Sequence, residues 1–182
     1  MNFPNKLTTL RMILIVVLLG IYFLPLKILE TTLYISIKDW SILIIFIVAS
    51  LTDFFDGYYA RKYHLITTYG KFMDPLADKL LVNITLLLLI LDARVHPLVF
   101  ILMFIRDIAV DGLRMLSSSK GVVIAAGQLG KAKTALQMVA IISIYLKIPI
   151  ISTVLIYLAL IMSLLSGMLY LYNGRKIILE SI

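Results

Sequence analysis

The sequence predicts an all-α integral membrane protein with six transmembrane helices, and three observations lead to this fold class. Hydrophobic residues make up 62% of the 182 residues and charged residues only 15%, whereas soluble domains carry roughly 25% charged residues. Six apolar segments each approach the roughly 20 residues that a helix needs to cross a bilayer. The charges of these segments lie at alternating ends. We therefore expect one membrane domain over residues 1–182, without a separate soluble domain.

The six expected helices lie near residues 7–25, 39–62, 71–91, 95–116, 131–147 and 149–173. The first has Lys6 and Arg11 at its start and no small-residue cleavage site after it, so we expect a retained span. The second carries its charges at its finish, the third at its start, the fourth at its finish and the fifth at its start. The sixth is free of charge over a full membrane width.

This alternation predicts the topology, because successive spans run in opposite directions and all charged ends then lie on one side. Of the 17 Lys and Arg residues, 13 lie on that side, and the remainder are Lys27, Lys38, Arg94 and Lys147. The positive-inside rule makes the richer side cytoplasmic, together with both termini. We expect a multi-pass protein of the cell membrane, surrounded by membrane lipids, with no nucleic-acid partner.

Four aspartates, Asp53, Asp56, Asp74 and Asp78, lie where the second and third expected helices reach this side. Acidic residues contribute little to orientation and cost about 3 kcal/mol each at membrane depth, so their presence indicates function. At about 100° per residue, the first two share one face of their helix and the last two share a face of the next. The short segment between the helices can set these faces against each other.

Four carboxylates so close together would repel one another and take up protons unless cations lay among them. Oxygen ligands without His or Cys favour a hard divalent ion, Mg²⁺ first and Mn²⁺ second, and four carboxylates suit two ions. The chain has no cysteine, and His64 and His96 lie outside the pattern, so we assign them no catalytic role. A two-metal site at a membrane edge suits chemistry on phosphate.

Each aspartate also has a structural alternative. Asp74 could cap a helix that starts at Pro75. Asp56 could belong to a turn with the glycine that follows it, and Asp78 could pair with a neighbouring lysine. Together these alternatives would have to explain why all four acids share two helix ends, so we favour a common site.

Eight residues at fixed spacing run through this region: Asp53, Asp56, Gly57, Ala60, Arg61, Gly70, Asp74 and Asp78. The pattern resembles the signature of the CDP-alcohol phosphotransferase family. The resemblance implies a six-helix membrane fold, usually homodimeric, that moves a phosphatidyl or similar group from a CDP-linked donor to an alcohol and releases CMP.

The resemblance also implies a role for each residue of the pattern. Asp53, Asp56 and Asp74 would hold the metal ions. Asp78 would complete the shell of the second metal or act as the base towards the acceptor hydroxyl. The CMP part of the donor would be surrounded by Gly57, Ala60, Arg61 and Gly70.

Three further stretches, "NFPNKLTTLRMIL", "RDIAVDGLRMLSSSKG" and "GKAKTALQ", are similar to the bacterial branch of this family that uses CDP-diacylglycerol as donor and glycerol 3-phosphate as acceptor. With them the resemblance extends from residue 2 to about residue 140. One departure is Asp107, which follows Arg106 where that branch commonly has glutamate.

The distribution of positive charge agrees with an anionic acceptor, because hydrogen-bond donors and cations gather on the side of the aspartates. We expect the acceptor phosphate to be bound by Thr8, Arg11, Arg106, Arg114, Lys131 and Lys133. The alternative for the basic residues is that they only set topology. Serine or inositol phosphate as acceptor, an intramembrane prenyltransferase and a magnesium transporter also remain open.

Overall fold

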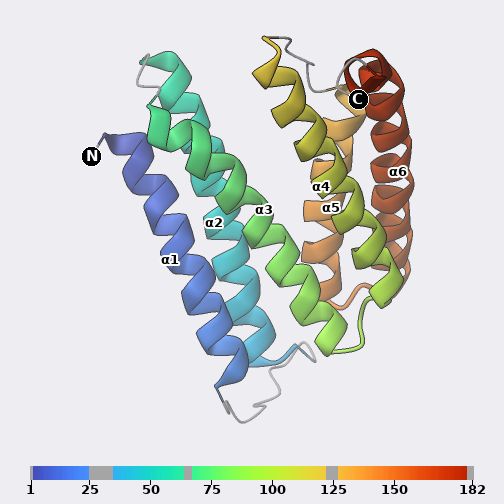
Figure 1. The fold of residues 1–182 in the computed structure, drawn as a ribbon. Coiled ribbons are helices and arrows are strands. Elements are labelled where there is room, and N and C mark those ends of the chain that lie inside the picture. The colour runs from blue at the N-terminus through green and yellow to red at the C-terminus, as the bar shows by residue number, and fades with distance from the viewer. Residues whose placement is uncertain (1, 25–34, 64–66, 122–126, 180–182) are drawn as a thin grey trace. The chain divides into compact units, whose positions relative to one another are not determined.

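The computed structural model describes residues 2–24, 35–63, 67–121 and 127–179. These residues form six helices and no strand: α1 (Phe3–Phe23), α2 (Ile37–Lys62), α3 (Thr68–Leu91), α4 (Pro97–Ser119), α5 (Gln128–Tyr145) and α6 (Pro149–Leu179) (Figure 1). The expected all-α class is confirmed. Each helix coincides with an apolar segment of the sequence, with ends that differ by a few residues.

The chain divides into two compact units, residues Met1–Leu89 and Ile90–Ile182, called here the N-terminal and C-terminal units. In the N-terminal unit α1 packs against α2, and Leu18 and Phe46 are fully buried. In the C-terminal unit α6 packs against both α4 and α5. A small apolar cluster of Val110, Leu113 and Tyr170 lies between α4 and α6.

The start of α3 shows whether Asp74 caps a helix that begins at Pro75. Thr67 precedes the helix, and its hydroxyl oxygen accepts a hydrogen bond from the backbone N–H of Gly70 at 3.0 Å, which is N-cap geometry. Pro75 therefore lies inside α3, and Asp74 is not a helix cap. The turn alternative at Asp56 is wrong as well, because α2 continues through this position to Lys62.

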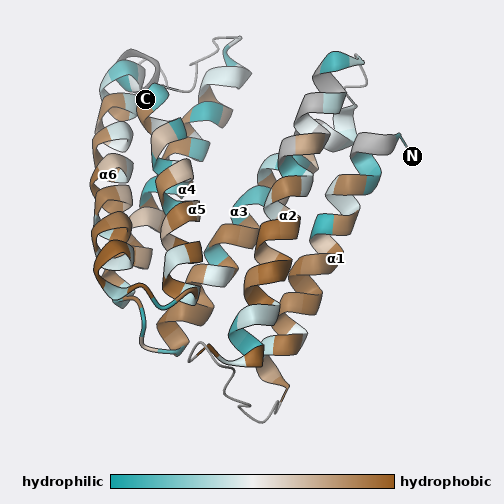
Figure 2. Ribbon diagram, turned by 180° about the vertical axis from the view of Figure 1, so that it is seen from behind, coloured by the Kyte–Doolittle hydropathy of each residue, from teal (hydrophilic) through white to brown (hydrophobic). Residues whose placement is uncertain are grey.

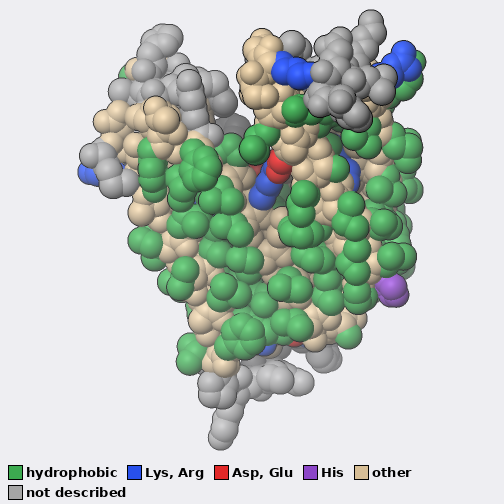
Figure 3. All heavy atoms as spheres, in the orientation of Figure 1, with side chains coloured by type: hydrophobic (Ala, Val, Ile, Leu, Met, Phe, Trp, Pro, Cys, Tyr) green, Lys and Arg blue, Asp and Glu red, His purple; other side chains and the backbone are tan. Residues whose placement is uncertain are grey.

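Exposed apolar surface characterises the helices of both units. By length and hydropathy, α1 over Asn5–Phe23 and α6 over Pro149–Arg175 could each cross a membrane. Large apolar side chains are exposed on all six helices: Val16, Ile44, Phe72, Ile105, Val139 and Ile150 are examples. Hydrophobic residues predominate along α1, α2 and α6 in Figure 2 and cover most of the described surface seen in Figure 3. So much exposed apolar surface indicates a membrane protein.

Candidate active site

Two of the predicted metal-binding carboxylates converge on one face of α1. Arg11 Nη1 lies 2.6 Å from Asp53 Oδ1, and the Thr8 hydroxyl donates to Asp74 Oδ1 at 2.6 Å. Residues three apart on a helix are neighbours on its surface, so Thr8 and Arg11 bring an acid from α2 and an acid from α3 to the same part of α1. Asp53 and Asp74 thus contact neighbouring positions of α1.

The pair of Arg11 and Asp53 is asymmetric. The Arg11 side chain is 0% exposed, whereas the Asp53 side chain is 35% exposed. A guanidinium so deeply buried requires an anionic partner. Asp53 is such a partner, and part of its side chain remains exposed. The structure therefore gives Arg11, which we predicted to bind the acceptor phosphate, a direct contact with a predicted metal ligand.

Further hydrogen bonds fix the start of α3 against α1. The Thr67 hydroxyl donates to Asn5 Oδ1 at 2.9 Å while it accepts from Gly70. One turn along α1, the hydroxyls of Thr9 and Tyr69 lie 3.3 Å apart. These contacts set the position of the helix that carries Asp74. Thr67 was not predicted from the sequence, although a threonine three residues before Gly70 is a recognisable cap signal.

Gly70 has a local structural reason to be glycine. A Cβ at this position would lie 3.3 Å from Asp74 Oδ2 and 3.3 Å from the Thr67 hydroxyl oxygen. The Asp74 carboxylate accepts from Thr8 through its other oxygen, and the Thr67 hydroxyl bonds to Asn5 and Gly70, so a shift of either group would strain these hydrogen bonds. The absence of a side chain at Gly70 thus leaves space for the Asp74 carboxylate. This structural reason is independent of any contact between Gly70 and the CDP-linked substrate.

The remaining residues of the signature are placed less completely. Asp78 lies one turn after Asp74 on α3 and is half-buried. The side chains of Asp56, Ala60 and Arg61 lie outside the described residues, and Gly57 is within α2. Among the side chains that are described, no three of Asp, Glu and His lie close enough together to hold a metal ion. The four-carboxylate metal site remains a prediction.

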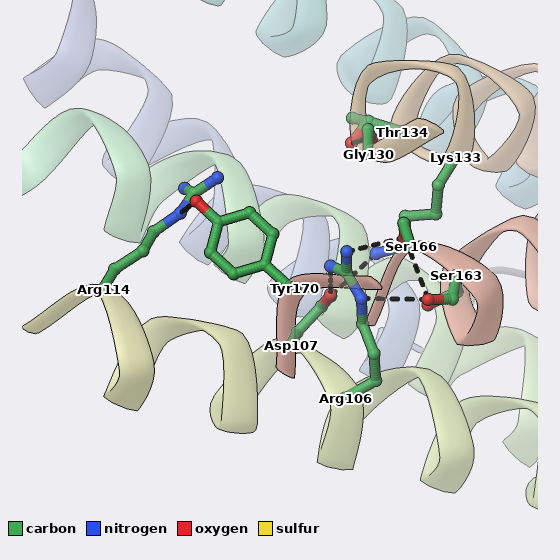
Figure 4. Close-up of polar contacts among 9 residues, drawn as sticks. All are labelled: Arg106, Asp107, Arg114, Gly130, Lys133, Thr134, Ser163, Ser166 and Tyr170. Carbon is green, nitrogen blue, oxygen red and sulfur yellow. Dashed lines mark hydrogen bonds and ion pairs between the residues drawn. The ribbon is translucent and has the colours of Figure 1, made fainter. Parts of the chain in front are cut away.

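A buried charge network occupies the C-terminal unit (Figure 4). Asp107 accepts from Arg106 Nη1 at 2.9 Å through one oxygen and from Lys133 Nζ at 2.8 Å through the other. Arg106 also donates from Nε to the Ser163 carbonyl at 3.0 Å and from Nη2 to the Ser166 hydroxyl at 2.7 Å. The network joins α4, α5 and α6. Aspartate at position 107 is long enough to reach both cations.

The other two predicted phosphate ligands of this unit are exposed. Arg114 donates from Nε to the Tyr170 hydroxyl at 3.1 Å, and its guanidinium lies 5.3 Å from the centre of that ring. Lys131 lies at the start of α5 with its side chain in the open. The structure thus brings Arg106 and Lys133 together at Asp107 and leaves Arg114 and Lys131 at the surface.

The partners of Arg106 and Arg114 on α6 are functional candidates that sequence reasoning missed. The pattern of charged residues does not indicate these partners, because α6 carries no charge over the width of a membrane. Small or polar residues recur every three or four positions on one side of this apolar helix: Ser163, Ser166, Gly167, Tyr170 and Gly174. Such a stripe is typical of close helix packing in membranes and was the available signal.

A cavity of about 130 Å³ lies elsewhere in the C-terminal unit. Its walls come from the beginnings of α4 and α6 and the end of α5, and include Arg94, His96 and Tyr157. His96 serves as the N-cap of α4, since Nδ1 accepts from the Leu98 backbone N–H at 3.2 Å. None of the predicted site residues lines this cavity.

Comparison with known proteins shows similarity across both units. Residues 1–165 match the family described as CDP-alcohol phosphatidyltransferase. Three relatives are each named CDP-diacylglycerol–glycerol-3-phosphate 3-phosphatidyltransferase. The Bacillus subtilis protein is 41% identical over 80% of this chain and 77% of its own length. The Rickettsia felis protein is 32% identical over 96% of both chains, and the Wigglesworthia glossinidia brevipalpis protein is 34% identical over 94% of both.

Proposed function

The chain belongs to the CDP-alcohol phosphatidyltransferase family, and we propose that it transfers the phosphatidyl group of CDP-diacylglycerol to glycerol 3-phosphate, giving phosphatidylglycerophosphate and CMP. The named activity of relatives that align over nearly the whole chain supports this donor and this acceptor. The structural observation that carries the proposal is the convergence of Asp53 and Asp74, two acids of the signature, on Thr8 and Arg11 of α1.

The reaction exchanges one bond at phosphorus for another. The acceptor's hydroxyl oxygen forms a bond to the phosphorus that bears the diacylglycerol, and the bond from that phosphorus to the CMP oxygen breaks. CMP leaves with the electron pair of the broken bond, and the hydroxyl proton must pass to a base. We assign this role to Asp78, because it follows Asp74 by one turn on α3 and a hydroxyl is a poor nucleophile until it is deprotonated.

The signature acids also fit a divalent cation. Asp53, Asp56, Asp74 and Asp78 would hold one or two ions, with Mg²⁺ preferred to Mn²⁺, because all four offer carboxylate oxygens. When bound, such ions supply positive charge that offsets the charge developing on the phosphate and on the departing CMP. Arg11 and Thr8 hold two of the carboxylates in place. In this proposal Gly57, Ala60, Arg61 and Gly70 surround the CMP moiety.

The acceptor residues separate into two groups by burial. Arg114 and Lys131 are exposed, so we assign them direct contact with the acceptor phosphate. The other four predicted phosphate ligands each bond to a carboxylate: Thr8 to Asp74, Arg11 to Asp53, and Arg106 and Lys133 to Asp107. We therefore assign them the role of holding these carboxylates in position. Charge-assisted bonds from an arginine and a lysine suit a phosphate dianion.

The proposed orientation in the membrane is based on the charge distribution. We propose six spans, cytoplasmic termini, an active site that faces the cytoplasm, and a homodimer in the cell membrane. The excess of Lys and Arg at one set of helix ends supports this arrangement. A cysteine placed at Ser119 should react only with reagents on the cytoplasmic side, and one placed at His96 only with reagents outside. The opposite labelling would reverse the proposed orientation.

Chemical cross-linking in native membranes tests the proposed homodimer. A cross-linked dimer is expected, and monomer alone would exclude the homodimer.

A single assay tests the activity. Purified protein with CDP-diacylglycerol and a divalent cation should release CMP when glycerol 3-phosphate is added, and each substrate alone should release none. Serine, inositol phosphate and unphosphorylated glycerol serve as parallel acceptors and should be poor substrates. Preference for serine or inositol phosphate would keep the family and change the acceptor. CMP release that needs no acceptor would contradict the transferase assignment.

A further inference from the structure

We propose that Gly167 and Ser166 of α6 are positioning residues for acceptor binding, acting through Arg106. This inference rests on the proposed function, and it concerns a helix whose sequence carries no charged residue over the membrane width. The two residues hold the Arg106 side chain in the orientation in which it shares Asp107 with Lys133.

Gly167 provides the space in which Arg106 lies. A Cβ at position 167 would be 2.7 Å from Arg106 Cγ, 3.3 Å from Nε and 3.6 Å from Cδ. Separations below 3.0 Å are essentially never seen for a Cβ atom, so a side chain at this position would displace the arginine. The arginine stem therefore packs directly on the backbone of α6, as small residues in membrane helices allow.

Arg106 has little freedom to avoid such a clash. Each of its three guanidinium nitrogens donates a hydrogen bond: Nε to the Ser163 carbonyl, Nη1 to Asp107 and Nη2 to the Ser166 hydroxyl. Figure 4 shows these groups converging on the guanidinium from α4 and α6. Moving Cγ would pull all three donors away from their acceptors. The geometry at Gly167 and the charge network are therefore coupled.

A second glycine on α6 provides a matched contrast. A Cβ at Gly174 would lie 2.5 Å from Leu113 Cδ2 and 3.0 Å from Leu113 Cδ1, also on α4. Leu113 Cγ lies 3.1 Å away, and all three atoms belong to an apolar side chain that is buried beside Val110 and Tyr170 and takes no part in the hydrogen bonds of Arg106. The seven-residue interval places both glycines on the same side of α6. Substitution at Gly174 therefore disturbs the same helix pair without disturbing the charge network.

The network reaches the acceptor residues through α5. Lys133 is buried and bonds to Asp107, whereas Lys131 is exposed. At about 100° per residue, two lysines two positions apart point to different sides of a helix. The inward lysine therefore fixes the rotation of α5 that presents the outward one. When Arg106 is displaced, Asp107 loses one of its two cations, and the carboxylate that binds Lys133 is held less firmly in its orientation.

Kinetics of the full-length protein in detergent or vesicles test the proposal. Gly167→Ala should raise the KM for glycerol 3-phosphate roughly tenfold, comparable to the loss of one charged hydrogen bond. The KM for CDP-diacylglycerol should change less than about twofold, since substitution at Gly167 leaves the donor contacts in place. Gly174→Ala should lower the unfolding temperature without this KM change. Equal KM increases in both variants would reduce Gly167 to a packing residue and overturn the proposal.

Ser166→Ala adds no atoms and tests the same arginine without a clash. It removes the acceptor of the Arg106 Nη2 hydrogen bond and should raise the KM for glycerol 3-phosphate roughly fivefold. An unchanged KM would remove Ser166 from the proposal.

A double-mutant cycle identifies the contact itself. In an Arg106→Ala background the atoms that a Cβ at position 167 would meet are gone, so Gly167→Ala should cost nothing further. The unfolding temperature reports this coupling even when catalysis is lost. A Gly167→Ala cost that persists in this background would show that Gly167 does not act through Arg106. If the parent protein failed to use glycerol 3-phosphate, the proposed function would fall, and the thermal cycle would still test the contact.

Discussion

The two units hold their charges in opposite ways. In the N-terminal unit, the buried cation Arg11 and the buried hydroxyl of Thr8 each hold one carboxylate, and Asp53 keeps about a third of its side chain exposed. In the C-terminal unit, one buried carboxylate, Asp107, holds two cations. The first arrangement exposes acidic groups, which the proposed metal site requires. The second leaves an excess of positive charge, which the proposed phosphate site requires.

The largest expected effect is loss of the acids that the N-terminal unit presents. Asp53→Asn, Asp56→Asn and Asp74→Asn should each lower CMP release at least about 100-fold and weaken binding of Mn²⁺, because a neutral amide replaces a charged ligand. Asp53→Asn should also lower the unfolding temperature, since the fully buried Arg11 loses the charge of an anionic partner 2.6 Å away. Asp74→Asn serves as the control for stability, because its Oδ1 can still accept the hydrogen bond from the Thr8 hydroxyl. Near-normal turnover in any of the three, in the presence of a chelator, would contradict the metal site.

Asp78 comes next, because its proposed role is proton transfer. Asp78→Asn should lower kcat by about 100-fold or more, the usual contribution of a positioned base. Binding of CDP-diacylglycerol, measured by equilibrium dialysis, should stay close to that of the parent protein. A loss of donor binding as great as in Asp53→Asn would instead make Asp78 mainly a metal ligand.

The exposed cations of the C-terminal unit should have a smaller and more selective effect. Arg114→Gln and Lys131→Gln should raise the KM for glycerol 3-phosphate about tenfold to a hundredfold, as expected when a charge-assisted bond is lost. The KM for CDP-diacylglycerol should change little. Lys120→Gln is a matched control on an exposed lysine that we expect to affect topology alone. Equal KM values for glycerol and glycerol 3-phosphate in the parent protein would exclude a phosphate clamp.

The smallest effect is expected at Gly70. In Gly70→Ala the new Cβ lies 3.3 Å from Asp74 Oδ2, a separation that a shift of a few tenths of an ångström relieves. Turnover should fall roughly threefold to tenfold, less than in Asp74→Asn, because the carboxylate is displaced and not removed. Gly20→Ala, where no neighbouring atom lies within 4 Å, is the control. Identical activity in the two variants would show that the space beside Asp74 has no functional role.

Several features of the site were accessible before the structure was known. The signature acids and the six helices follow from spacing and hydropathy, which are properties of consecutive residues. Asp74 was ambiguous because proline after an acid is typical of a helix start, and Thr67 removed the ambiguity by capping α3 earlier. The contact of Arg11 with Asp53 was not predictable, since a basic residue near the membrane edge serves topology equally well.

The sequence alone determined which segments are helices, which ends carry charge, and which acids form the signature, because each depends on a local period or spacing. The tertiary structure alone decided the partners: Thr8 for Asp74, Arg11 for Asp53, and Asp107 for both Arg106 and Lys133. These choices depend on the face that each helix turns towards its neighbour within a unit. Close packing selects that face, as where Arg106 lies on Gly167. Hydrophobic periodicity cannot select it, because these helices are apolar on nearly all sides.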